Sequence, residues 1–176
     1  EAGNRSKKLS WTTSVQDALQ GVDAVWVAFD TPVDENDQAD VSWVRRQIEA
    51  LFDVIATGSL MIVSSQAPVG FCRELEESFQ RKRPEAALTV CCSPENLRLG
   101  TALEAFQHPD RIVLGTRRPE DRSRLEPLFA RLSGNLVWMK TESAEMTKHA
   151  LNAFLATSAV WANEIGVLCE SVGANA

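Results

Sequence analysis

Five short apolar segments give the chain a repeating strand and helix pattern. Nearly continuous apolar runs are typical of strands that are buried on both faces, and we predict strands at 24–29, 60–63, 87–92, 111–115 and 136–139. Between and around them, apolar residues recur at helical spacing, and we predict helices at 14–20, 41–55, 71–82, 119–132 and 143–172. Ser14 and Asp40 are suitable N-caps, and Pro119 suits a first helical turn. This alternation predicts an α/β fold with a mostly parallel sheet that is covered on both faces.

The loops after the first three predicted strands are candidates for a binding site. Ligands of open parallel sheets lie beyond the carboxyl ends of the strands, which here lead into 30–32, 64–70 and 93–100. These loops contain Thr, Ser, Gln, Glu and Arg residues that can contact a polar ligand. The phosphate-binding pattern G-x-G-x-x-G does not occur in the sequence. If the sheet binds a dinucleotide, we expect its first strand and phosphate turn to precede Glu1.

The last predicted helix carries a polar row within an apolar sequence. Glu145, Lys148 and Asn152 stand at positions i, i+3 and i+7, which places them on one side of a helix. By spacing alone, the row fits a solvated stripe as well as a ligand-binding one. The same helix has large apolar residues that a partner could cover, namely Leu151, Leu155, Val160, Trp161, Ile165 and Leu168.

Composition excludes several classes of protein. The 176 residues are 44% hydrophobic and 24% charged, which is ordinary for a globular domain, and the net charge of -6 argues against nucleic-acid or anionic-membrane partners. No apolar run reaches the length of a membrane span. The four cysteines and two histidines lack metal-ligand spacing, so we predict no metal site. Adjacent Cys91 and Cys92 fit the core of a cytoplasmic protein with reduced thiols.

Five segments, in order, resemble motifs of the nucleotide-sugar dehydrogenases, the family of the UDP-glucose and GDP-mannose 6-dehydrogenases. The segments are DAVWVAFDTP at 23–32, VSSQAPVG at 63–70, SPENLRLGTA at 93–102, HPDRIVLG at 108–115 and SAEMTKHALNAFL at 143–155. The resemblance covers nearly the whole chain. It implies a Rossmann-like NAD-binding domain, of which this chain contains the second half.

The resemblance also implies a reaction. In this family, the primary alcohol of a sugar nucleotide is oxidised to a carboxylate by two molecules of NAD, through an aldehyde and a cysteine thioester. The developing oxyanions require fixed donors and positive charge, a role that the resemblance assigns to Lys148 and Asn152. Hydrolysis of the thioester requires a base that activates water, and the resemblance assigns this role to Glu95.

Further positions match the family's binding residues. Those that correspond to the NAD site are Thr31, Pro32, Gln66 and Glu95. Those that correspond to the binding site of the sugar-nucleotide substrate are Leu97, Arg98, Lys148 and Asn152.

The resemblance divides the chain into two domains. Residues 1–140 correspond to the C-terminal part of the NAD-binding domain, and 141–176 to the long connecting helix of the middle domain. In the family this helix packs against its twin, which implies a homodimer.

The sequence departs from the family pattern at several places. Gln66 stands where the family has a Thr hydroxyl, and Ser93, Asn96 and Leu99 replace the motif's Asn, Phe and second acid. The family's nucleophilic cysteine lies in a Gly-rich stretch that would follow Ala176. We therefore expect the chain to be a piece of a longer protein, unable to complete the reaction by itself.

Two other functions remain open. The chain could be a non-catalytic binding or dimerisation module that keeps the fold, which Gln66 and Leu99 favour. It could also belong to a hydroxy-acid dehydrogenase that uses one NAD and shares the sheet and the long helix.

Overall fold

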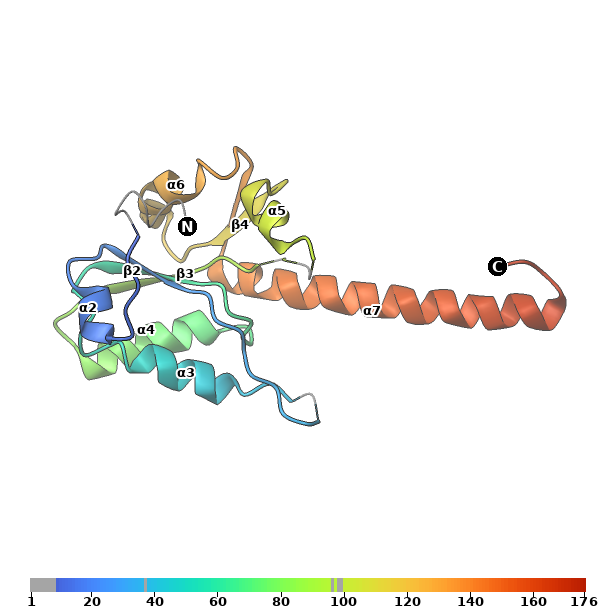
Figure 1. The fold of residues 1–176 in the computed structure, drawn as a ribbon, viewed down its shortest axis with the longest axis horizontal. Helices are drawn as coiled ribbons and strands as arrows, with labels where there is room; N and C mark the ends of the chain where they lie inside the picture. The colour runs from blue at the N-terminus through green and yellow to red at the C-terminus, as the bar shows by residue number, and fades with distance from the viewer. Residues whose placement is uncertain (1–8, 37, 96, 98–99) are drawn as a thin grey trace.

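The fold is built on a five-stranded sheet with the strand order β1-β2-β3-β4-β5 (Figure 1). The computed structural model describes residues 9–36, 38–95, 97 and 100–176. The strands are β1 (Ala24–Val27), β2 (Ser59–Val63), β3 (Leu88–Cys92), β4 (Ile112–Gly115) and β5 (Leu136–Met139). Neighbouring strands are parallel except β3 and β4, which are antiparallel. The prediction of a mostly parallel α/β sheet is confirmed.

Helices connect and flank the strands. They are α2 (Val15–Leu19), α3 (Val41–Glu49), α4 (Phe71–Lys82), α5 (Ala102–Gln107), the 3₁₀ turn η1 (Pro119–Asp121), α6 (Arg122–Phe129) and α7 (Thr141–Val172). The two predicted N-caps are confirmed, because Ser14 accepts a hydrogen bond from the N–H of Asp17 and Asp40 from that of Trp43.

Two predictions about helices were wrong. The helix predicted at 41–55 ends at Glu49, and the chain continues in tight turns in which the N–H of Phe52 bonds to the carbonyl of Glu49. Phe52 and Ile55 are still buried in these turns. The apolar spacing therefore predicted correctly which residues are buried, but it did not predict where the helix ends. Helix α5 was not predicted: its six residues span less than two turns, too few to establish a helical period although four of them are apolar.

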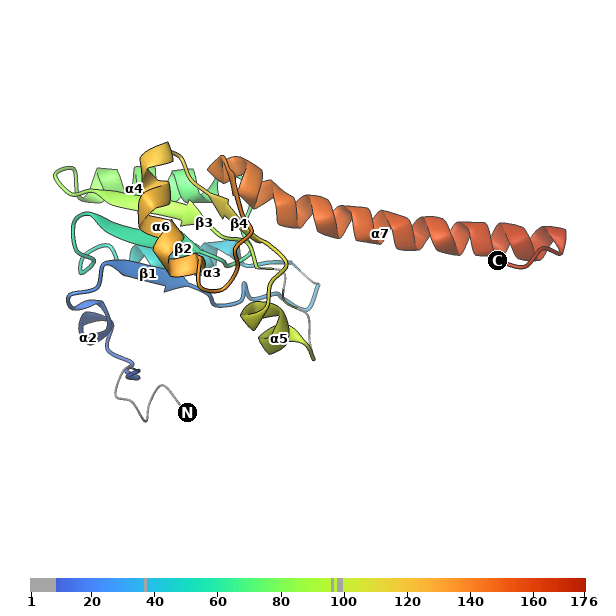
Figure 2. The ribbon, with the colours of Figure 1, turned by 90° about the horizontal axis from the view of Figure 1, so that it is seen from above.

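Two hydrophobic cores cover the two faces of the sheet. Helices α3 and α4 lie on one face, and α5 and α6 on the other (Figures 1 and 2). The alternation along β2 separates the cores, because Met61 and Val63 point to the α3–α4 side whereas Leu60 and Ile62 point to the α6 side. Since all five residues of β2 are buried, the prediction of strands covered on both faces holds at the centre of the sheet.

Helix α7 begins against the sheet and then projects away from it (Figures 1 and 2). Its first turn is buried at Thr141, Ala144 and Glu145. Beyond Asn152 nearly every residue is exposed. In the part of the chain that the structure describes, neither α7 nor any other helix is long and apolar enough to cross a membrane.

The antiparallel join between β3 and β4 is short. One residue pair, Cys92 with Gly115, joins the two parallel parts of the sheet, and α7 packs against both strands at this junction. The approach is close: a Cβ atom added to Gly115 would lie 2.5 Å from the Ala144 Cβ and 2.9 Å from the Thr141 Cα. Gly115 therefore allows α7 to dock at the junction.

We predict that Gly115→Ala lowers the free energy of unfolding by about 1–3 kcal/mol, because the added methyl group overpacks the contact with Ala144 and Thr141. Urea denaturation followed by circular dichroism measures the change. Gly134→Ala is the matched control, since a Cβ there meets no atom within 4 Å. An unchanged stability of Gly115→Ala would show that the close packing at the junction is not required.

Candidate functional site

The loops that follow β1, β2 and β3 are joined by hydrogen bonds at the carboxyl edge of the sheet. The Thr31 hydroxyl donates to the carbonyl of Gln66 over 2.6 Å, and the Ser65 hydroxyl donates to the carbonyl of Phe29 over 2.5 Å. The Ser64 hydroxyl donates to the carbonyl of Ser93 over 2.7 Å. These bonds hold the three loops in one surface before any ligand arrives.

A small pocket, open in part to solvent, lies where the loops after β2 and β3 meet the start of α7. The loop after β2 contributes Ser65 and Gln66, and the loop after β3 contributes Glu95. Helix α7 contributes Lys148, and the floor contains Cys92. Elements far apart in sequence thus meet at the place where open α/β sheets bind ligands.

Lys148 and Glu95 form an ion pair across the pocket. The ammonium of Lys148 lies 3.2 Å from the Oε1 of Glu95 and also donates to the Glu95 carbonyl over 3.1 Å. The Lys148 side chain is 16% exposed and that of Glu95 is 42% exposed. The Lys148 side chain is therefore largely shielded from water, whereas water can reach the Glu95 carboxylate. Such an arrangement can stabilise a developing oxyanion and accept a proton from water.

Asn152 lies apart from this pair. Asn152 is four positions beyond Lys148, which corresponds to about 6 Å along the helix axis. Its side chain is exposed, and within the described residues it makes no hydrogen bond. At this point α7 has left the sheet, and none of the elements that the structure describes covers Asn152.

The other expected site residues that the structure describes belong to the loops after β1, β2 and β3. The exposed Gln66 side chain lines the pocket. Pro32 is exposed, and its carbonyl accepts the N–H of Asp40. Leu97 is 40% exposed, and its N–H donates to the Oε2 of Glu95 over 2.6 Å. The expected substrate contact Arg98 lies outside the described residues, as do Asn96 and Leu99.

The polar row expected on α7 is not one surface in the structure. The Glu145 carboxylate is buried and accepts hydrogen bonds from the N–H groups of Gly70 and Cys72, at 2.6 and 2.8 Å. Lys148 instead reaches Glu95, and Asn152 faces solvent. Sequence reasoning did not identify Glu145 as a contact of the loop, although an acid among apolar residues signals a need for donors.

A second contact from α7 to the same loop also escaped sequence reasoning. The Nε2 atom of His149 lies 2.9 Å from the carbonyl oxygen of Ala67. Together with Glu145, it attaches the first turns of α7 to the loop that forms one wall of the pocket.

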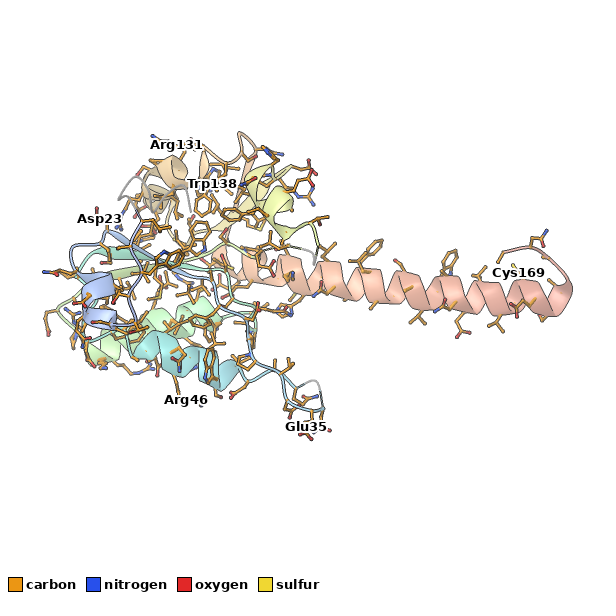
Figure 3. The ribbon with its side chains drawn as sticks, in the orientation of Figure 1. Asp23, Glu35, Arg46, Arg131, Trp138 and Cys169 are labelled. Carbon is orange, nitrogen blue, oxygen red and sulfur yellow. The ribbon has the colours of Figure 1, made fainter. Side chains whose placement is uncertain are left out.

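Two buried thiols of the chain, those of Cys72 and Cys91, are poor nucleophiles. Hydrogen bonding with the Cys92 thiol, together with burial, raises the pKa of the Cys72 thiol well above its usual value. Burial raises the pKa of Cys91 to about 12. Cys169 lies on the outer part of α7, far from the sheet (Figure 3). Because the thiolate is the reactive form, Cys72 and Cys91 are structural. The described residues contain no cluster of metal-ligating side chains.

Comparison with known proteins gives a consistent result along the chain. The sequence model described as the NAD binding domain of the UDP-glucose/GDP-mannose dehydrogenase family matches residues 1–133. The model of the central domain of that family matches residues 142–176.

Curated relatives include the UDP-glucose 6-dehydrogenase of Rhizobium meliloti, which is 36% identical over 97% of this chain and 40% of that protein. The UDP-glucose 6-dehydrogenase of Rickettsia conorii is 33% identical over 97% of this chain and 39% of that protein. The chain thus spans about two fifths of the length of these relatives.

Solved structures agree in fold. A UDP-glucose dehydrogenase from Pyrobaculum islandicum superposes with a TM-score of 0.82 at 30% identity, over 98% of this chain and 41% of that one. A GDP-mannose dehydrogenase from Pseudomonas aeruginosa superposes with a TM-score of 0.85 at 23% identity, over 99% of this chain and 42% of that one.

We predict that iodoacetamide at about pH 8 modifies Cys169 in the folded protein well before Cys72 or Cys91, because raised pKa values and burial keep the latter two protonated and covered. Mass spectrometry of timed samples measures the order. Unfolding in urea provides the control, since all three should then react. Rapid labelling of Cys72 in the folded protein would instead identify a reactive thiol in the pocket.

Proposed function

The chain belongs to the UDP-glucose/GDP-mannose dehydrogenase family, and on that basis we propose that it is part of an NAD-dependent enzyme that oxidises a nucleotide sugar to its uronate. The observation that carries the proposal is the Lys148–Glu95 pair in the pocket at the carboxyl edge of the sheet. The pair places a cation that is shielded from water beside a carboxylate that water can reach. Oxidation of the alcohol requires the cation, and hydrolysis of the thioester requires the carboxylate.

We assign the chain to two parts of the enzyme. Residues 1–140 form the C-terminal part of the NAD-binding domain, and 141–176 form the long helix that begins the middle domain. The separate matches of two family models, at 1–133 and 142–176, support this division. The projection of α7 away from the sheet supports it as well.

The pocket fits the reactive end of NAD in its chemistry. Polar loop groups line the carboxyl edge of β1, β2 and β3, and the bond from Thr31 to Gln66 fixes two of those loops before binding. We propose that Thr31, Pro32, Gln66 and Glu95 border the cofactor. NAD, when bound, accepts a hydride from the substrate carbon.

Lys148 stabilises negative charge on the substrate oxygen in this proposal. The Lys148 side chain is 16% exposed, so little water competes for the hydrogen bonds of its ammonium group. Its carbonyl contact with Glu95 keeps it in place even when the Glu95 carboxylate engages water. Glu95 then acts as the base that activates water, which its 42% exposure permits.

We propose that Asn152, Leu97 and Arg98 contact the remainder of the sugar nucleotide. Asn152 is exposed about one turn beyond Lys148. This position is within reach of a substrate that binds along α7. The N–H of Leu97 donates to the carboxylate of Glu95, which lines the pocket, so Leu97 lies close to the proposed substrate.

The exposed apolar residues of α7 support a homodimer. On one face of the helix, Phe154 is 68% exposed, Trp161 65% and Leu168 57%. From 151 to 172 the helix contains only two charged residues, Glu164 and Glu170. An apolar helix face of this length requires cover, and a second copy of the same helix satisfies the requirement by symmetry. We also propose a cytoplasmic location, since all four cysteines are free thiols.

We predict that the full-length enzyme forms about two NADH per molecule of nucleotide sugar oxidised, and that Lys148→Ala lowers kcat about a hundredfold or more, because one donor to the oxyanion is lost. Absorbance at the NADH band, with UDP-glucose, UDP-N-acetyl sugars and GDP-mannose as substrates, measures both quantities.

Lys140→Ala is the matched control, since this exposed residue caps α7 without a side-chain bond, and its rate should remain that of the wild type. Oxidation of small hydroxy acids with about one NADH each would favour the hydroxy-acid alternative instead. The absence of NADH with every substrate would favour the non-catalytic module.

We predict that Trp161→Arg converts a dimer of the protein into monomers, because a charge would replace a large apolar group at the helix pairing surface. Sedimentation equilibrium measures the mass. Trp11→Arg is the control, since Trp11 is 79% exposed but lies outside α7. An unchanged mass in both variants would show that Trp161 is not at an interface.

A further inference from the structure

The N-terminus of α4 is capped by a side chain from a distant element. Gly70 occupies the N-cap position with a φ of 97°, and, having no side chain, it cannot cap the helix itself. The Glu145 carboxylate, 75 residues later in the chain, accepts the N–H of Gly70 through one oxygen and that of Cys72 through the other. The positive end of the helix dipole adds to this attraction.

This contact tolerates little displacement. Glu145 is 6% exposed, and among the described residues its carboxylate has no ion-pair partner. Its charge is compensated by the two N–H groups, through charge-assisted bonds that are stronger than neutral ones. Moving the carboxylate would leave a buried charge and two buried N–H groups unpaired, so the geometry is strongly preferred.

The capping contact also fixes the helix that carries Lys148. Glu145 and Lys148 lie three residues apart on α7, and a rotation or shift of the helix moves both. Glu145 anchors α7 to the loop between β2 and α4, and the contact of His149 with the Ala67 carbonyl is a second anchor. The wall of the pocket and the helix that carries the ammonium are therefore held as one unit.

We propose that Glu145 is a positioning residue for the oxidation: by binding the N-terminus of α4, it holds the Lys148 ammonium at its place opposite Glu95. This inference rests on the proposed function, in which Lys148 donates to the substrate oxygen. It assigns to Glu145 no contact with substrate or cofactor. Catalytic groups are sensitive to displacement, since an error of about 1 Å can cost about a hundredfold in rate.

The test is a double-mutant cycle in the full-length enzyme with Glu145→Gln and Lys148→Ala. The Gln side chain keeps the shape but replaces one accepting oxygen by an NH₂ group, which cannot accept the N–H that oxygen received. With Lys148 present, we expect Glu145→Gln to lower kcat about tenfold and to change the KM for NAD less than about twofold. In the Lys148→Ala background, we expect the same change to alter kcat less than about twofold.

Thermal unfolding separates positioning from a general loss of structure. Glu145→Gln should lower Tm equally in both backgrounds, because the bonds to Gly70 and Cys72 do not depend on Lys148. Glu142→Gln is the matched control on the same helix. Glu142 pairs with Arg117 on the surface and does not touch the loop, so its substitution should leave kcat unchanged. Glu145→Asp, which keeps the charge, replaces Glu145→Gln in the cycle if the latter does not fold.

Each outcome bears on one of the two proposals. Glu145→Gln, or its Asp substitute, could lower kcat by the same factor in both backgrounds or leave kcat unchanged in both. Either result would show that Glu145 does not act through Lys148. The positioning role would then be overturned, while the proposed function would stand. If Lys148→Ala itself leaves kcat unchanged, the proposed role of Lys148 is overturned and the positioning role with it.

Discussion

The docking of the first turn of α7 onto the sheet is the constraint on which the rest of the structure depends. Ala144 is fully buried against Gly115, so the helix lies as close to β4 as backbone geometry permits. The next residue, Glu145, binds the start of α4. The start of α7 thus joins β4, the N-terminus of α4 and the loop that forms one wall of the pocket. Within the described sheet itself, the two parallel parts pair at Cys92 and Gly115 alone.

The pocket owes its position to that junction. Parallel strands direct the loops after β1, β2 and β3 to one edge, and side-chain to backbone bonds join those loops to one another. Helix α7 closes the edge and supplies a cation to it. The site is therefore assembled from the sheet, which matches the NAD-binding model of the family, and from α7, which matches its central-domain model. The loops and the ammonium of Lys148 are thereby attached to one rigid element.

The departure from the family pattern at Gln66 concerns the pocket rather than the framework. Gln66 extends a carboxamide into the place of a hydroxyl, and its side chain is exposed at the pocket mouth. The framework contacts do not depend on this side chain, since the Thr31 hydroxyl bonds to the backbone carbonyl at 66. The side chain at this position can therefore vary without a change in fold.

The sequence by itself determined the five strands, the long helix and the family. Apolar runs and helical spacing are local properties, and five ordered motifs identify an ancestry before any contact is known. The sequence also placed Glu95 and Lys148 among the candidates, and the structure brings them together. Only the tertiary structure decided that Glu145, Lys148 and Asn152 point to three different environments. A side chain's direction on a helix is fixed by spacing, but its surroundings depend on which element packs against that turn, and α7 leaves the sheet within two turns.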